Sequence, residues 1–147
     1  ITEDYVSFET AKLLKEKGFD GSCYKVWESH GDSQTLVGAP WFVEGETVVN
    51  RESVDAASKQ YVYEYNLNNN VEGYLAPSIQ MAMKWLRENK GIAIVPIVSS
   101  VLDNEKFLWD IKIIVAKTNG TYMQGWVYES YENACEKAIK YCLGNLI

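Results

Sequence analysis

The sequence is poor in histidine, since His30 is the only one among 147 residues. This excludes metal sites built from several histidines, and it makes any Ser-His-Asp or Cys-His catalytic arrangement depend on one residue. His30 lies in the turn-forming cluster Ser29–Ser33, where side chains are normally solvated. We therefore expect no catalytic residue and no metal site. The alternative is a small enzyme that uses His30 with Asp32 and either Cys23 or Ser33.

Clusters of positive charge are also absent. The chain has 14 basic and 20 acidic residues and a net charge of −6, which disfavours phosphate-rich partners and anionic membranes. No apolar run approaches the ~20 residues that a membrane-spanning helix needs. The glycines lack the spacing of dinucleotide-binding or phosphate-binding loops. We expect no nucleic acid partner, no membrane partner and no cofactor.

Cysteine is scarce and odd in number, with Cys23, Cys135 and Cys142. The last two lie seven residues apart on a predicted helix, which places them about 10 Å apart, beyond the reach of a disulfide. Buried free thiols are typical of a reducing compartment. This favours a cytoplasmic location.

The N-terminal part begins with a predicted helix from Phe8 to about Lys17. Ser7 can cap its first turn and Gly18 can end it, with Phe19 placed for the apolar contact that follows such a glycine. Two strands should follow as a hairpin around the Ser29–Ser33 turn, at residues 23–28 and 36–43.

A further connection at Glu44–Glu46 leads into an expected strand at Thr47–Val49. Residues 51–58 fit either a short helix or an open loop. Tyr61, Tyr63 and Tyr65 alternate with polar or smaller residues up to Leu67, which is the period of a half-buried strand.

The C-terminal part should open with a helix from Pro77 to about Lys90, ended by Gly91. Strands are predicted at Ile92–Val101, where Pro96 marks an edge or a bulge, and at Phe107–Lys117. In the second strand the residues expected on the core face are Trp109, Ile111, Ile113 and Val115.

Asn119-Gly120 is a strong signal for a two-residue hairpin turn. This turn would place Val115 opposite Gln124, and further along it would place Ile113 opposite Trp126 and Ile111 opposite Tyr128. Ser130 should then cap a last helix that Gly144 ends. The expected inner face of that helix comprises Ala134, Cys135, Ala138 and Cys142.

Together these elements predict an α+β fold with an antiparallel sheet and helices packed on one face. We expect a single domain over residues 1–147. Within it, residues 1–73 would carry an N-terminal helix and β-hairpin elaboration, and residues 74–147 an α-β-β-β-α unit.

The order helix, three strands, helix over residues 77–143 resembles the topology of the double-stranded-RNA-binding domain. That family binds phosphates with a lysine-rich motif at the start of its last helix. The matching stretch here, Ser130–Glu136, contains no Lys or Arg. The resemblance therefore implies a fold, and the charge disfavours RNA binding.

Three other segments carry a second resemblance: residues 7–19, residues 75–78 leading into 84–88, and residues 130–134. They are similar to segments of short proteins, without an established activity, from gut bacteria of the Bacteroides type and their prophages. This resemblance implies an intracellular accessory protein, with phage derivation as an open alternative, and it implies no mechanism.

Aromatic residues are abundant, with five Trp and ten Tyr, and these residue types are enriched at interfaces. The candidate binding residues are Tyr61, Tyr63, Tyr65, Met81 and Trp85. We expect a non-enzymatic binding or regulatory protein that presents an aromatic-rich surface to a protein partner or to a second copy. The alternative is a small enzyme or ligand-binding domain with a pocket between the N-terminal half and the helix beginning at Pro77.

Overall fold

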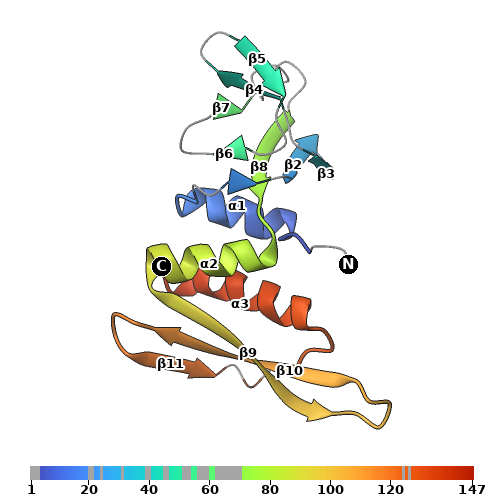
Figure 1. Ribbon diagram of the computed structural model, residues 1–147, viewed down its shortest axis with the longest axis vertical. Helices are drawn as coiled ribbons and strands as arrows, with labels where there is room; N and C mark the ends of the chain where they lie inside the picture. Colours follow the sequence, from blue (N-terminus) through green and yellow to red (C-terminus); the bar gives the residue numbers. More distant parts are fainter. Residues whose placement is uncertain are drawn as a thin grey trace. The chain divides into compact units, whose positions relative to one another are not determined.

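The computed structural model describes residues 4–19, 22–23, 25–30, 32–38, 41–44, 47–50, 54–55, 60–61, 71–123, 125 and 127–147. Helices and antiparallel strands are both present, which confirms the α+β class (Figure 1). The chain forms two compact units, Ile1–Ser78 and Ile79–Ile147. The predicted division at residue 73 stays a prediction, as does the single domain.

The first unit opens with α1, Phe8–Glu16. Ser7 caps it as predicted, and its Oγ accepts a hydrogen bond from the Thr10 amide at 3.3 Å. At the other end Gly18 adopts φ +84°, and the Phe19 amide donates to the Leu14 carbonyl at 2.9 Å. This bond, with Phe19 buried, forms the expected Schellman-type end.

A three-stranded sheet with the order β3-β2-β8 follows, built from β2, Lys25–His30, β3, Ser33–Gly38, and β8, Val71–Ala76. The predicted hairpin is confirmed for β2 and β3, although its strands reach further into the turn than expected, because His30 pairs with Ser33. The second strand does not run to residue 43 as predicted, because β3 ends at Gly38 and Trp41–Glu44 form a strand of a different sheet. Strand β8 was not predicted. Residues 73–76 are all buried, so this strand lacks the alternation of a half-exposed strand.

Aromatic contacts join α1 to this sheet. The Phe8 ring lies 6.2 Å from the Trp27 ring and 5.4 Å from the Tyr74 ring, edge to face in both cases. Trp27 Nε1 donates to the Val6 carbonyl at 2.9 Å. The helix and the strands therefore share one core, which includes the fully buried Leu14.

Shorter strands complete the description of the first unit. They are β1, Ser22–Cys23; β4, Trp41–Glu44; β5, Thr47–Asn50; β6, Val54–Asp55; and β7, Gln60–Tyr61. The sheet orders are β1-β6 and β5-β4-β7. Glu44 pairs with Thr47, which agrees with the expected tight connection. Residues 62–70, with most of the predicted tyrosine strand, lie outside the described residues.

The second unit begins with α2, Ile79–Lys90, followed by Gly91 at φ +65°. The end of this helix is as predicted, but its start lies two residues later than Pro77. Tyr5 and Ser78 form an isolated antiparallel bridge, and the Pro77 carbonyl accepts from the Val6 amide at 3.0 Å. Extended pairing therefore holds this segment before the helix starts.

The sheet of this unit contains β9, Ile92–Val101, β10, Phe107–Val115, and β11, Gly120–Met123. The order β11-β10-β9 makes β9 an edge strand, as Pro96 predicted. Ile111 and Ile113 are fully buried, so the predicted core face of β10 is correct.

The hairpin between β10 and β11 corrects the predicted register. Val115 pairs with Gly120 rather than Gln124, because the loop contains four residues, Ala116–Asn119, instead of two. Asn119 adopts φ 52°, and the Gly120 amide donates to Thr118 Oγ1 at 3.2 Å. The shift is an even number of residues, so each side chain keeps its face of the sheet.

The chain returns to β10 at Tyr128, which bridges to Trp109 and not to Ile111 as expected. Both backbone hydrogen bonds of this pair measure 2.8 Å. The Ile111 amide donates to Asp110 Oδ1 at 2.7 Å. Ile113, which was expected opposite Trp126, pairs with Tyr122, and Trp126 itself lies outside the described residues.

The last helix, α3, spans Tyr131–Asn145. Ser130 caps it as predicted, with the Asn133 amide donating to Ser130 Oγ at 3.0 Å. Gly144 does not end the helix, because helical structure continues to Asn145 and the Leu146 amide donates to the Cys142 carbonyl. The buried face contains the four predicted residues together with Ile139 and Leu143. Helices α2 and α3 cover one face of the sheet (Figure 1).

Candidate functional site

The residues proposed from the sequence as binding residues are only partly described. Trp85 is buried, with 6% of its surface exposed, and Lys90 Nζ lies 5.5 Å from the centre of its ring. Met81 is half-buried. Tyr61 belongs to β7, and its side chain lies outside the described residues, as do Tyr63 and Tyr65. A binding role for these five residues stays a prediction.

His30 occupies the end of β2 and not a turn, because only residues 31 and 32 separate it from its strand partner Ser33. Its other partner is Val71 in β8. The proposed nucleophile Cys23 lies in β1, which pairs with β6 in a different sheet. The backbone thus places Ser33, and not Cys23, directly across from His30.

The two cysteines of α3 are buried and free. Burial raises the pKa of Cys135 to about 11, against a smaller lowering effect of its hydrogen bond with Tyr131. Burial likewise raises the pKa of Cys142 to about 12. Both groups are therefore neutral thiols near pH 7, and a thiol attacks carbon far more slowly than a thiolate.

The described residues contain no group of three or more His, Cys, Asp and Glu side chains that could hold a metal ion. Among them there is also no helix long and apolar enough to cross a membrane.

A different surface stands out in the second unit, where the β9–β10 hairpin extends beyond the ends of the helices (Figure 1). Helix α2 has 12 residues, about 18 Å at 1.5 Å per residue, whereas β9 has 10 residues, about 33 Å at 3.3 Å per residue. The helices therefore cover only part of the strands. We call the uncovered part, residues 98–109, the hairpin arm.

A β-bulge shapes the apolar face of the arm. Trp109 pairs with Val98, but Phe107 pairs with Val101, so Ser99 is an extra residue on β9. Residues three apart in a strand normally point to opposite faces, and the bulge places Val98 and Val101 on the same one. That face also carries Ile111 and Ile113, so the arm continues the core face of the sheet.

Four apolar side chains are exposed here. Val101 is 62% exposed, Phe107 49%, Val98 43% and Leu102 40%. Elsewhere in the described residues, the exposed large apolar side chains are Val95, on the other face of β9, Tyr122 in β11, and Val127 and Ile147 outside the helices and strands. A cluster of exposed apolar side chains marks an interaction surface more often than scattered ones do.

Aromatic contacts anchor the arm to the start of α3. The Trp109 ring lies 6.0 Å from the Phe107 ring and 5.2 Å from the Tyr131 ring, edge to face in both cases. Tyr131 Oη in turn accepts from Gln80 Nε2 of α2 at 2.9 Å. These contacts fix Trp109 between the core and the exposed Phe107, so the apolar strip is preformed.

The same environment affects two tyrosines. Burial and the negative charge of Asp110 raise the pKa of Tyr128. The hydrogen bond from Gln80 lowers the pKa of Tyr131, but burial and the neighbouring Cys135 outweigh it, and the net shift is upward. Both phenols are therefore neutral near pH 7 and supply aromatic surface rather than charge.

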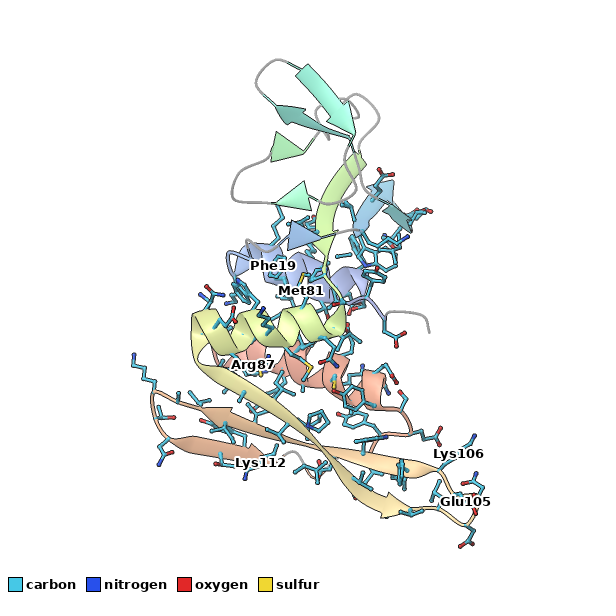
Figure 2. All side chains as sticks on the ribbon, in the orientation of Figure 1. Phe19, Met81, Arg87, Glu105, Lys106 and Lys112 are labelled. Atoms are coloured by element: carbon cyan, nitrogen blue, oxygen red, sulfur yellow. The ribbon has the colours of Figure 1, made fainter. Side chains whose placement is uncertain are left out.

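A hollow beside the tip of the arm is lined by Leu102, Asn104, Lys106, Phe107, Leu108 and Glu129. Figure 2 shows Glu105 and Lys106 at this tip. Glu105 adopts φ 65°, and the Leu102 amide donates to the Lys106 carbonyl at 2.8 Å. The charged side chains in this lining are Lys106 and Glu129.

Sequence reasoning missed the arm, although a signal for it was present. At 3.3 Å per residue the strands predicted at Ile92–Val101 and Phe107–Lys117 are about 33 and 36 Å long, whereas the helix predicted from Pro77 to Lys90 is about 21 Å long at 1.5 Å per residue. A helix of that length can cover only about three fifths of such strands. The apolar residues at the distal end should therefore be exposed.

Searches with models of known protein families, among curated proteins and among solved structures found no match to this chain.

Proposed function

We propose that this protein is a non-enzymatic binding or regulatory accessory protein that acts through the aromatic-rich surface of the hairpin arm. The observation that carries the proposal is the exposure of Val98, Val101 and Phe107 on one face of a preformed strip. Burying such side chains is favourable, at about 25 cal/mol per Å² of apolar surface. A partner protein that covers them gains this free energy without reordering the arm.

A cytoplasmic location belongs to the same proposal, since the buried thiols of Cys135 and Cys142 are typical of proteins in reducing compartments. The chain carries a net charge of −6, which supports a protein partner over a nucleic acid. The two family resemblances stay predictions and add no mechanism.

The proposal predicts that the double variant Val101→Thr/Phe107→Thr no longer binds the partner protein. Threonine keeps the β-propensity of the strand while removing most of the apolar surface. The wild-type chain and the variant should each be used as bait, and the amount of every protein captured from cells that express the chain should be measured. The captured amount of a partner should be at least tenfold lower with the variant, because truncating a central apolar anchor commonly costs more than about 1.4 kcal/mol of binding free energy.

The matched control is Tyr122→Thr, which removes an aromatic side chain of similar exposure, 38%, from β11 in the same sheet. It should leave the captured proteins unchanged. Equal capture by the arm variant and the wild type would contradict the proposal, and so would equal losses from the two variants.

A further inference from the structure

We infer that the hairpin arm binds a basic amphipathic helix of a partner protein, an inference that rests on the proposed function and adds the chemistry of the partner. The charges around the arm are mainly negative. Exposed carboxylates belong to Asp103 and Glu105 in the turn at its tip, and to Glu129 and Glu132 at the start of α3. Lys106 is the one basic residue among residues 98–109 and 129–132.

The opposite end of the same unit has the opposite charge. The Gly91 carbonyl accepts from the Ala116 amide at 2.9 Å, which places the end of α2 beside the β10–β11 loop. This end carries Arg87 and Lys90 on α2 and Lys117 in the loop, together with the carboxylate of Glu88, which pairs with Lys84 at 3.9 Å. The unit is thus polarised, and its apolar strip lies at the acidic end.

This polarity argues against two other occupants of the arm. Two copies that paired arm to arm would bring Asp103, Glu105 and Glu129 of each copy close to those of the other, and like charges brought together in this way cost free energy. An anionic membrane surface would be repelled for the same reason. A partner with apolar and basic side chains complements both features of the surface.

The outer edge of β9 is poorly suited to receive an added strand. Because Gly91 and Ala116 form a hydrogen-bonded pair, the alternation of an antiparallel ladder makes Pro96 and Ile111 a non-hydrogen-bonded pair. The Pro96 nitrogen therefore faces the outer edge, where an added strand would need a donor. A strand added along β9 would lose this hydrogen bond two residues before the arm, which favours recognition of the arm through side chains, as by a helix.

The apolar strip suits a short helical contact. The face that carries Trp109 and Phe107 continues the face on which α2 and α3 pack, so a bound helix would extend the existing helical layer. Phe107 and Trp109 are about 7 Å apart along the strand, which corresponds to between one and two helical turns. Contacts this small give weak binding, with a Kd on the order of 10 μM.

The experiment titrates the full chain with three fluorescent 18-residue helical peptides at ~0.15 M salt, where distant charges are screened. The first has a leucine face and a lysine face, the second has glutamate in place of lysine, and the third has glutamine in place of leucine. We expect the leucine-lysine peptide to bind at least tenfold more tightly than the other two. Equal binding of the leucine-lysine and leucine-glutamate peptides overturns the inference.

Two charge-changing variants separate a local effect from the effect of net charge. Glu105→Lys/Glu129→Lys should weaken binding of the leucine-lysine peptide by about tenfold. The control Glu88→Lys/Asn89→Lys/Asn145→Lys changes the net charge equally, at exposed positions near the C-terminal ends of α2 and α3, and should change binding less than twofold. Equal losses in the two variants would mean that net charge alone attracts the peptide, and would overturn the inference.

Phe107→Thr distinguishes this inference from the proposed function. One outcome is that the wild type binds the leucine-lysine and leucine-glutamate peptides equally and that Phe107→Thr weakens the binding of both. In that case the arm is a binding surface and only the charge preference is wrong. If Phe107→Thr leaves peptide binding unchanged while circular dichroism shows a native fold, the arm is not the binding surface and both proposals fail.

Discussion

Replacing Ile113 with alanine should lower the free energy of unfolding by about 2–5 kcal/mol, the usual cost of truncating a buried aliphatic side chain. Ile113 is fully buried, on the face of β10 that α3 covers. Its strand partners are Ile94 in β9 and Tyr122 in β11. The truncation therefore leaves a cavity that neither neighbouring strand can fill without moving.

Urea denaturation measures this loss, and Ile114→Ala is the matched control. Ile114 is the next residue of the same strand, has the same side chain and points to the other face, where it is half-buried. It should cost less than about 1.5 kcal/mol. A loss below about 1 kcal/mol for Ile113→Ala, or equal losses for the two variants, would mean that the core lies on the other face.

Raising the pH above about 9 should destabilise the protein through its two buried thiols. The ordinary thiol value is 9.0, whereas the folded chain has a pKa of about 11 at Cys135 and about 12 at Cys142. Between these values the folded state holds more protons than the unfolded state, so stability is fully present below pH 9 and falls as the pH rises. At pH 10.5 the expected loss is about 2 kcal/mol per thiol, from ~1.4 kcal/mol per pKa unit.

Urea denaturation at pH 8 and pH 10.5 tests this effect. The comparison is the variant Cys135→Ala/Cys142→Ala, which keeps every other titrating group, including the tyrosines whose pKa is also raised. Its loss of stability over this interval should be smaller by several kcal/mol. If the variant and the wild type show the same dependence on pH, the thiols are not buried as described.

Helix ends were predictable where a single residue determines the backbone. Ser7 and Ser130 have the side-chain oxygen that an N-cap needs, and Gly18 takes the positive φ that ends α1. Gly144 has the same identity but a different outcome. A glycine is tolerated within a helix at a cost of about 1 kcal/mol, and burial of Cys142 and Leu143 stabilises the last turn of α3 beyond it.

Strand features were predictable where they depend on alternation alone. The core face of β10 follows directly from the spacing of its apolar residues. The register of the hairpin does not, because Asn119 can take a positive φ either within a two-residue turn or at the end of a four-residue loop. Strand β8 gave no alternating signal, since Gly73–Ala76 is buried throughout.

The exposure of the hairpin arm depends on the lengths of the helices relative to the lengths of the strands that they cover. Phe107 and Ile113 lie on one face of one strand and have the same periodic signal. They differ because the helices end before they reach Phe107, which the predicted lengths of the elements indicate and the apolar periodicity does not. Pro96 predicted an edge or a bulge in this strand, and the bulge lies three residues later, at Ser99, where no glycine or proline marks it.

The central claim is that the apolar face of the arm serves a partner and not the fold. The stability of Phe107→Thr tests it most directly. Phe107 is half-exposed and contacts Trp109, so we predict that its replacement lowers the free energy of unfolding in urea by about 1 kcal/mol or less. A loss of about 3–5 kcal/mol, typical of truncating a buried phenylalanine, would mean that the chain itself covers this side chain and would contradict the account.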